Sequence, residues 1–208
     1  MDAVTGRFIT IEGSEGVGKS TQMQFIADYL RDHGKSVVTT REPGGTPVAE
    51  QIREVLLQSE LGSMTDRCEL LLMFAARADH VTQVIRPALG RGDWVLCDRF
   101  TDATYAYQGG GRGMPEHDIE ILERFVLHDL VPNLTILLDA PPEITAARRL
   151  SRGTSDRFEA EKTAFFERVR SKYQQRARHD PDRIKLVDAS VSIIEVQDKI
   201  TSQLNIIL

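Results

Sequence analysis

The sequence has few cysteines, no long apolar run and no signal-like start, and each shortage excludes a class of protein. Cys68 and Cys97 are the two cysteines in 208 residues, which argues against a disulfide framework or a cysteine-rich zinc site and fits a reducing compartment. No apolar run approaches the roughly 18 residues of a membrane span. The segment 1–7 lacks the apolar core of a signal peptide. We therefore expect a cytoplasmic chain without a membrane partner.

An excess of positive charge is also missing. Lys and Arg together number 26 against 31 Asp and Glu, giving a net charge of −5, which disfavours a dedicated nucleic-acid binder. With 41% hydrophobic residues, the 208 residues are enough to bury a core without disulfides or metal. We expect one domain over residues 1–208.

Short apolar runs alternate with longer amphipathic segments along the chain. The apolar runs predict strands at 8–12, 36–40, 94–97, 134–138 and 183–187. The longer segments predict helices at 20–31, 47–58, 65–89 (as one or two helices), 115–130, 142–150, 161–178 and 193–204. This alternation predicts an α/β fold of three layers, with a five-stranded parallel sheet flanked by helices. Ligands bind such sheets at the carboxyl ends of the strands.

A glycine-rich loop follows the first predicted strand and opens the first helix. Its residues fit the P-loop pattern G-x-x-x-x-G-K-[ST]: Gly13, Ser14, Glu15, Gly16, Val17, Gly18, Lys19 and Ser20, followed by Thr21. Successive backbone N–H groups of such a loop, with the helix N-terminus, bind phosphates. Lys19 is expected to reach the β- and γ-phosphates, and Ser20 to bind Mg²⁺. The loop therefore predicts ATP with Mg²⁺.

Two aspartates end predicted strands and compete for the water-mediated contact to Mg²⁺. Asp98 follows the third strand and Asp139 the fourth, and either could instead cap a helix. The Asn-Lys-x-Asp motif of guanine-binding switches does not occur in the sequence. The P-loop alone leaves the acceptor of the phosphoryl group open.

Arginines gather in two groups despite the acidic net charge. The first group follows the strands or lies on the helices that lead from them: Arg41, Arg53, Arg77, Arg99 and Arg112. The second group flanks a short polar break between two helices: Arg148, Arg149, Arg152 and Arg157. These cations predict recognition of a second phosphate and a closing lid at about 149–160. Because the P-loop carries no arginine, we expect Arg152 to neutralise charge in the transition state.

The chain resembles the bacterial type of the thymidylate kinase family along essentially its whole length. The resemblance is carried by the following runs: 13–21 with Glu15, 40–46 (TREPGGT), 74–77 (FAAR), 98–100 (DRF), 106–113 (AYQGGGRG) and 156–159 (DRFE). It implies the reaction ATP + dTMP → ADP + dTDP, with Mg²⁺, in a homodimer. The dTMP phosphate is already an anion, so the reaction needs positioning and charge neutralisation rather than a strong base.

The resemblance also implies a set of residues that contact dTMP: Glu15, Glu42, Pro43, Arg53, Met73, Phe74, Arg77, Arg99, Thr104, Tyr107 and Gln108. By resemblance, Glu15 approaches the 3′-hydroxyl, and Arg53 and Arg99 hold the 5′-phosphate. Tyr107 packs under the deoxyribose, where a 2′-hydroxyl would collide.

The same resemblance divides the remaining roles between the base, the metal and ATP. Arg77 and Gln108, with Thr104, are implied to contact the thymine edge. Asp98 is implied to support Mg²⁺ through water. Arg148, together with 188–190, is implied to form the wall of the adenine site.

One position departs from the family pattern. Many relatives place an aromatic residue four positions before the arginine that matches Arg77, where this chain has Met73; its aromatic residue, Phe74, stands three before. Both positions share a helical side with Arg77. Either Met73 covers the thymine with its thioether or Phe74 does so from another angle.

Two other hypotheses remain at this stage. A kinase for another small molecule would share the fold, although Arg53 and Arg99 favour an acceptor that already carries phosphate. A P-loop ATPase or switch would turn over ATP without an acceptor. The glycine run at 109–113 could be a flexible loop, although ordering three adjacent glycines is costly.

Overall fold

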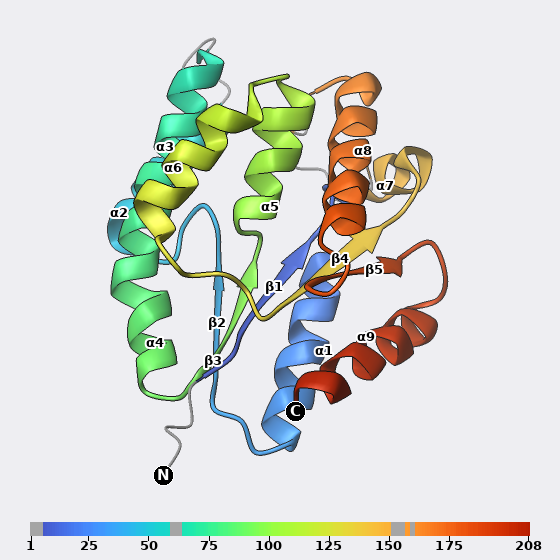
Figure 1. Cartoon of the computed structure of the whole chain (residues 1–208). Coiled ribbons are helices and arrows are strands. Elements are labelled where there is room, and N and C mark those ends of the chain that lie inside the picture. The colour runs from blue at the N-terminus through green and yellow to red at the C-terminus, as the bar shows by residue number, and fades with distance from the viewer. Residues whose placement is uncertain (1–5, 59–63, 151–156, 159–160) are drawn as a thin grey trace.

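The structure is a computed structural model that describes residues 6–58, 64–150, 157–158 and 161–208. Its centre is a five-stranded sheet in the order β2-β3-β1-β4-β5, and all the pairs are parallel. The strands are β1 (Phe8–Glu12), β2 (Val37–Arg41), β3 (Trp94–Asp98), β4 (Leu134–Asp139) and β5 (Ile184–Asp188). The α/β prediction with its five parallel strands is confirmed (Figure 1).

Helices connect the strands and cover the sheet. They are α1 (Lys19–Asp32), α2 (Pro47–Leu57), α3 (Asp66–His80), α4 (Arg86–Gly90), α5 (Thr101–Thr104), α6 (Glu116–Leu127), α7 (Pro142–Leu150), α8 (Thr163–His179) and α9 (Ile193–Ile207). Two π-helical segments continue α3 and α5, namely η1 (Val81–Ile85) and η2 (Tyr105–Gly111). Within the described residues, none of these helices is long and apolar enough to span a bilayer.

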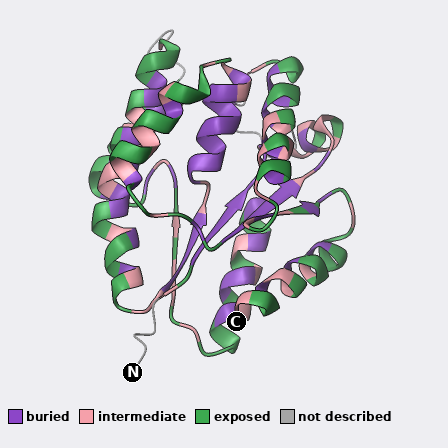
Figure 2. Ribbon diagram, in the orientation of Figure 1, coloured by how far each residue is buried: buried purple, intermediate pink, exposed green. Residues whose placement is uncertain are grey.

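The helices form one layer on each face of the sheet. On one face, α1 and α9 pack against the strands through a core that includes Ile26, Leu30 and Ile200. On the other face, α4, α5, α6 and α8 cover the strands, with Ile85, Val169 and Tyr173 in the core. Figure 2 shows the buried sheet between exposed outer helix surfaces.

Alternation along β1 directs its side chains to the two layers in turn. Ile9 and Ile11 pack toward α1, whereas Phe8 packs toward η1 and α4. Thr10 on that second face forms a buried hydrogen bond of 2.7 Å with Thr135 of β4. The same alternation carries Glu12, which is fully buried, to the face covered by α5 and α8.

The helical run after β3 was not predicted. The glycines of η2 lie in a continuous helical path, and an added Cβ would come within 2.7 Å of Lys172 at Gly110 and 2.4 Å of Phe165 at Gly111. This glycine run is therefore not a flexible loop. Because Gly110 and Gly111 have no side chains, η2 can pack closely against α8. Tertiary packing overrides the poor helix propensity of glycine here.

Candidate active site

The P-loop surrounds an anion-binding hollow at the carboxyl end of β1. Gly13, Gly16 and Gly18 have φ values of 135°, 80° and 105°, which glycine adopts without strain. The loop is also tight, since a Cβ on Gly13 would lie 2.4 Å from the carbonyl oxygen of Leu138 on β4. Lys19 Nζ donates to the carbonyl oxygens of Gly13 and Ser14 at 3.2 and 3.3 Å. Burial and the charge of Arg99 lower the pKa of Lys19.

Asp98 and Asp139 differ in how their carboxylates are used. Asp139 receives two hydrogen bonds from Arg170, at 2.7 and 2.8 Å, and a third from Gln174. Asp98 Oδ1 is buried and has no hydrogen-bond partner in the part of the chain that the structure describes, and the residue lines a hollow together with Lys19 and Ser20. Of the two acids, Asp98 has the unused acceptor.

The donor set beside the P-loop fits Mg²⁺ held largely by phosphates. Ser20 and Asp98 supply oxygen atoms on the same hollow, and the described residues contain no cluster of three or more His, Cys, Asp or Glu that could hold a metal alone. Mg²⁺ commonly binds through one or two protein oxygens together with substrate phosphates and water. The residues present therefore fit this ion.

Arg99 connects the P-loop to the opposite wall of the site. Its Nη1 donates to Gly13 O at 2.8 Å and to the Tyr173 hydroxyl at 3.2 Å. Its Nη2 donates to Glu15 at 2.6 Å and to the Tyr107 hydroxyl at 3.0 Å. Arg99 also has a left-handed φ of 67°, unusual for a side chain of this size. This many contacts hold a strained residue in one position.

The Glu15 carboxylate lies within this cationic region. Burial alone would raise the pKa of Glu15, but the charges of Arg99 and Lys19 outweigh it and lower the value to about 2. Glu15 is therefore ionised at neutral pH and can accept a hydrogen bond from a hydroxyl group.

Tyr173 connects Arg99 to the buried carboxylate of Glu12. Sequence reasoning gave neither Glu12 nor Tyr173 a role. Glu12 accepts hydrogen bonds from the backbone N–H groups of Phe100 and Ala103 at 2.7 and 3.3 Å. The Tyr173 hydroxyl donates to Glu12 at 2.8 Å and accepts from Arg99. Burial, with the charge of Asp102, raises the pKa of Glu12 to about 7. The sequence signal that could have pointed to Glu12 is its position directly before Gly13, the first glycine of the P-loop.

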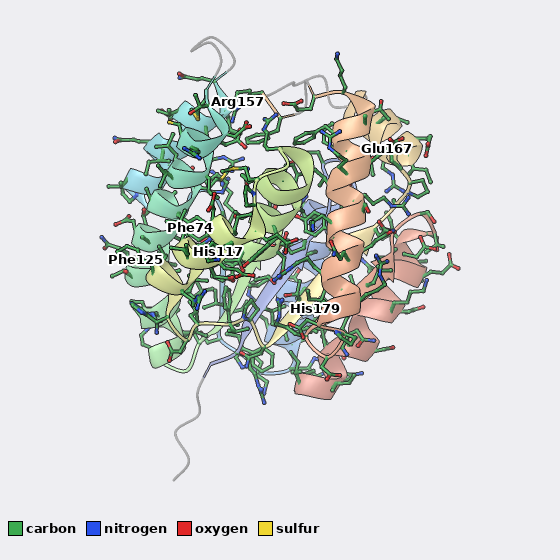
Figure 3. The ribbon with its side chains drawn as sticks, turned by 45° about the horizontal axis from the view of Figure 1, so that its top comes forward. Phe74, His117, Phe125, Arg157, Glu167 and His179 are labelled. Carbon is green, nitrogen blue, oxygen red and sulfur yellow. The ribbon has the colours of Figure 1, made fainter. Side chains whose placement is uncertain are left out.

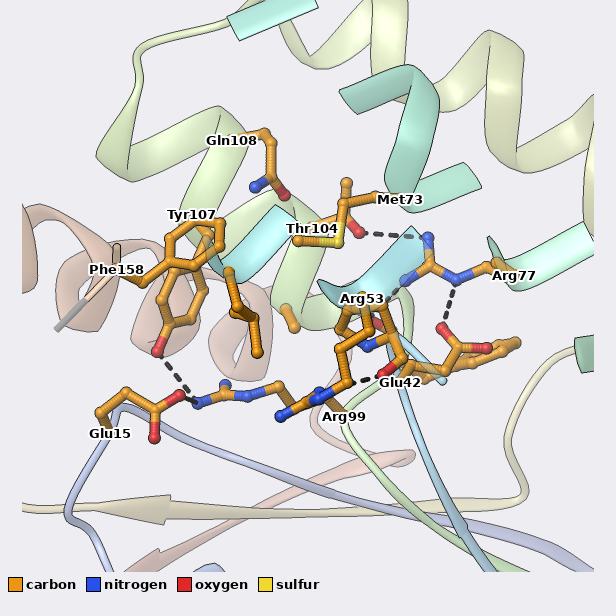
Figure 4. A pocket seen from close by; sticks show the side chains of 14 residues that line it. Glu15, Glu42, Arg53, Met73, Arg77, Arg99, Thr104, Tyr107, Gln108 and Phe158 are labelled. Carbon is orange, nitrogen blue, oxygen red and sulfur yellow. Dashed lines mark hydrogen bonds and ion pairs between the residues drawn. The ribbon is translucent and has the colours of Figure 1, made fainter. Parts of the chain in front are cut away.

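A cavity opens between the P-loop side and helices α2, α3 and α5 (Figure 4). Most residues that the resemblance assigned to dTMP line it: Glu15, Glu42, Pro43, Arg53, Met73, Arg77, Arg99, Thr104, Tyr107 and Gln108. Phe158, which was not assigned, completes the wall beside Tyr107 at a ring distance of 5.9 Å. A lining that mixes apolar side chains with a few charged and polar groups suits a small organic ligand.

Arg77 is held at the end of this cavity away from the P-loop. Its Nε donates to Glu42 at 2.6 Å, its Nη1 to Thr104 Oγ1 at 3.1 Å, and its Nη2 to Phe100 O at 3.1 Å. Glu42 also forms a 2.9 Å hydrogen bond with Nδ1 of His80, which is buried. Glu42 thus acts on this cavity mainly through Arg77.

Met73 and Phe74 lie in different surroundings. Met73 lines the cavity, while Phe74 does not. Phe74 packs in a buried cluster with Leu70, Tyr105 and Ile119, and its ring lies 4.8 Å from the Arg77 guanidinium carbon. The structure thus brings Met73, and not Phe74, to the cavity surface.

The remaining predicted residues lie near the P-loop or outside the description. Arg148 Nη1 donates to Ala189 O at 3.2 Å and lies 3.5 Å from Val17 O, so α7 joins the P-loop to the segment after β5. Arg152, expected in the transition state, lies outside the described residues, as does most of the expected lid. Arg157 is described and binds Glu69, away from the P-loop.

Comparisons with known proteins show which proteins this chain is similar to. Residues 11–200 match the family model described as thymidylate kinase. The chain is 58% identical to the thymidylate kinase of Pseudomonas savastanoi pv. phaseolicola, covering 93% of this chain and 92% of that protein. It is 57% identical to the protein of the same name from Pseudomonas putida F1, covering 97% and 96%. The crystal structure of the thymidylate kinase from Ehrlichia chaffeensis superimposes with a TM-score of 0.77 at 32% identity, covering 97% of this chain and 99% of that one.

Proposed function

The chain belongs to the thymidylate kinase family and phosphorylates dTMP to dTDP with ATP as donor, for dTTP supply; from this premise we propose how its residues divide the work. One observation carries the proposal. Of the residues that line the cavity beside the P-loop, Glu15, Arg53 and Arg99 also line the P-loop hollow, whereas Arg77 and Gln108 do not. This polarity matches a nucleoside monophosphate that lies with its phosphate toward the P-loop.

In this placement, dTMP makes three kinds of contact. Arg53 and Arg99 bind its 5′-phosphate, and Glu15 accepts from the 3′-hydroxyl. Tyr107 packs under the deoxyribose, with its hydroxyl held by Arg99 at 3.0 Å. Thr104 and Gln108 lie with Arg77 along the base edge, and Met73 covers the ring with its thioether, since it is Met73 that reaches the cavity.

Phosphoryl transfer then proceeds by positioning and charge neutralisation. An oxygen of the dTMP phosphate attacks the γ-phosphorus of ATP in line with the leaving ADP oxygen. Lys19 and Arg99 neutralise the oxygens between donor and acceptor, and Mg²⁺ bound by Ser20 and by Asp98 through water would polarise the β- and γ-phosphates. Arg148 and Ala189 border the adenine. Arg152, from the lid at 149–160 of this single domain, neutralises negative charge on the phosphates in the transition state.

We also propose a cytoplasmic homodimer. One set of exposed apolar side chains lies on the neighbouring helices α2, α3 and α6, and a second set lies on α9. The first set is Val48 and Val55 on α2, Leu71 on α3, and Ile121 and Phe125 on α6, and the second is Ile193, Ile194 and Ile206. Phe125, 76% exposed, lies on the outer side of this helical layer (Figure 3). An apolar surface of this kind suits a second copy of the chain. The exposed thiol of Cys68 suits a reducing compartment.

Replacing Arg53 with alanine tests the placement of dTMP. Arg53 lines both the cavity and the P-loop hollow, so its loss is expected to raise the dTMP KM about ten- to a hundredfold, with a smaller change in the ATP KM. A coupled ADP assay, in which the dTMP and ATP concentrations are varied in turn, measures the two KM values. The same assay with dUMP and UMP compares the acceptors. Arg91→Ala, at an exposed site beyond the cavity lining, is the matched control. An unchanged dTMP KM in Arg53→Ala would refute the placement.

A further inference from the structure

Glu69 is a buried acid that none of the roles above explains. It lies on α3 with 1% of its surface exposed. Its Oε1 accepts from Gln108 Nε2 at 2.8 Å and from Arg112 Nε at 3.4 Å. Its Oε2 accepts from Arg112 Nη2 at 3.2 Å and from Arg157 Nη2 at 2.5 Å. Two guanidinium groups thus compensate the charge of one buried carboxylate, which also holds the amide of Gln108.

This contact determines which way the Gln108 amide points. A carboxylate can only accept hydrogen bonds, so the NH₂ group of Gln108 must face Glu69. The carbonyl oxygen then faces the other way. Gln108 lines the cavity with its amide end toward it (Figure 4), and among the described residues no donor contacts Gln108 Oε1. Gln108 therefore offers the cavity a hydrogen-bond acceptor.

Arg77 offers the same cavity a donor. Its guanidinium has five N–H groups and no acceptor, and its contacts to Glu42, Thr104 and Phe100 use three of the five. Glu42 and Glu69 thus hold groups of opposite hydrogen-bonding character at the part of the cavity that faces the base. Glu42 fixes a group that can only donate, and Glu69 fixes an amide so that it accepts.

The resulting donor and acceptor distinguish the pyrimidines chemically. Thymine and uracil carry an O4 acceptor beside an N3–H donor, which complements Arg77 and Gln108. Cytosine carries an N4 amino donor beside an unprotonated N3 acceptor, so it opposes both groups. A site with fixed hydrogen-bonding groups rejects a ligand that leaves them unpaired.

We propose that Glu69 is a positioning residue for base specificity, which holds the Gln108 amide with its oxygen toward the cavity so that the site accepts a pyrimidine with an imide edge and rejects cytosine. The proposal rests on the placement of the dTMP base given above. It assigns discrimination to a residue that does not itself line the cavity.

The variant Glu69→Gln tests the proposal. A glutamine at 69 can donate as well as accept, so the Gln108 amide can turn over. The preference for dTMP over dCMP, measured as kcat/KM for dTMP and as the inhibition constant for dCMP, is expected to fall at least about tenfold. The preference for dTMP over dUMP is expected to stay the same, because both bases present the same imide edge. An unchanged preference over dCMP in the folded variant would overturn the proposal.

Asp102→Asn is the matched control. Asp102 is also a buried acid with two arginine partners, Arg176 at 2.8 Å and Arg183 at 2.7 Å, but it does not line the cavity. Both variants are expected to lose stability, and only Glu69→Gln is expected to change base preference. An equal change of preference in Asp102→Asn would show a general effect of losing a buried acid, and would overturn the proposal.

Gln108→Leu keeps the proposal testable if Glu69→Gln does not fold. This variant removes the acceptor while leaving Glu69 with both arginines, so the preference over dCMP is expected to fall as in Glu69→Gln. In the double variant the second change is expected to add nothing to the preference. A preserved preference in Gln108→Leu overturns the proposal.

Met73→Ala separates this proposal from the placement on which it rests. If it leaves dTMP and dCMP binding unchanged, the base lies elsewhere and both proposals fail. If it weakens both while Gln108→Leu keeps its preference, only the role of Glu69 fails.

Discussion

The phosphate end and the base end of the site use charged residues in opposite ways. At the phosphate end, Lys19 contacts carbonyl oxygens, and Arg99 contacts carbonyl and hydroxyl oxygens and the partly exposed carboxylate of Glu15. Asp98 Oδ1 has no hydrogen-bond partner among the described residues. At the base end, Arg77 and Arg157 are each held by a buried carboxylate, from Glu42 and Glu69 respectively. The first end keeps charge available for ligands. The second uses charge to fix the direction of hydrogen bonds.

The largest effect is expected at the phosphate end, from Lys19→Met. The buried ammonium group acts on transferring charge, so its loss is expected to lower kcat about 10²- to 10³-fold while dTMP affinity changes little. Stability is expected to hold, because burial and Arg99 already disfavour the charged form of Lys19 and lower its pKa. Steady-state kinetics and dTMP calorimetry measure the two quantities.

Lys199→Met is the control for this variant. Lys199 lies on α9 at the surface, so the same loss of one charge there is expected to leave kcat unchanged. Equal losses of kcat in Lys19→Met and Lys199→Met would contradict the prediction that the Lys19 ammonium group acts on the transferring charge.

At the base end, Glu42→Gln is expected to affect stability more than catalysis. Removing one member of a buried pair leaves the charge of Arg77 uncompensated, which costs about 3 kcal/mol of unfolding free energy. The dTMP KM is expected to rise more than kcat falls. Urea denaturation and initial rates measure these effects.

Glu50→Gln provides the matched comparison for Glu42→Gln. Glu50 also pairs with an arginine, Arg41 at 2.8 Å, but its side chain is 39% exposed. Its replacement is expected to cost less than about 1 kcal/mol, as for exposed ion pairs. Similar losses in the two variants would mean that the base end does not depend on buried charge.

The two ends also differ in how far the sequence predicts them. The P-loop glycines, Lys19 and Ser20 are consecutive, so their pattern and its place after a strand identify the phosphate end. The acids of the base end act across long separations: Glu69 meets Gln108 and Arg157, 39 and 88 positions away. No local pattern states which arginine such an acid will hold. Likewise, η2 is stable through packing on α8, which glycine propensity opposes.

Glu12 is a buried acid at the phosphate end that forms no ion pair with an arginine among the described residues. It accepts from Phe100 N, Ala103 N and Tyr173. Burial, with the charge of Asp102, raises its pKa from 4.5 to about 7. The folded state thus holds a proton that the unfolded chain has already released above pH 4.5. Unfolding releases that proton, so stability falls as pH rises from 4.5 to 7 and changes little beyond.

The last prediction is therefore a pH dependence of stability that Glu12→Gln should remove. The wild-type protein is expected to lose on the order of 3 kcal/mol of unfolding free energy across that window, and Glu12→Gln, which mimics the protonated acid, much less. Urea denaturation at pH 5, 6, 7 and 8 measures the slope. Glu15→Gln is the control: the pKa of Glu15 is lowered to about 2, so its stabilising effect disappears only as pH falls below 4.5. Parallel slopes in the wild type and Glu12→Gln would contradict the prediction, because they would show that Glu12 is already ionised in the folded state across this pH range, as Glu15 is.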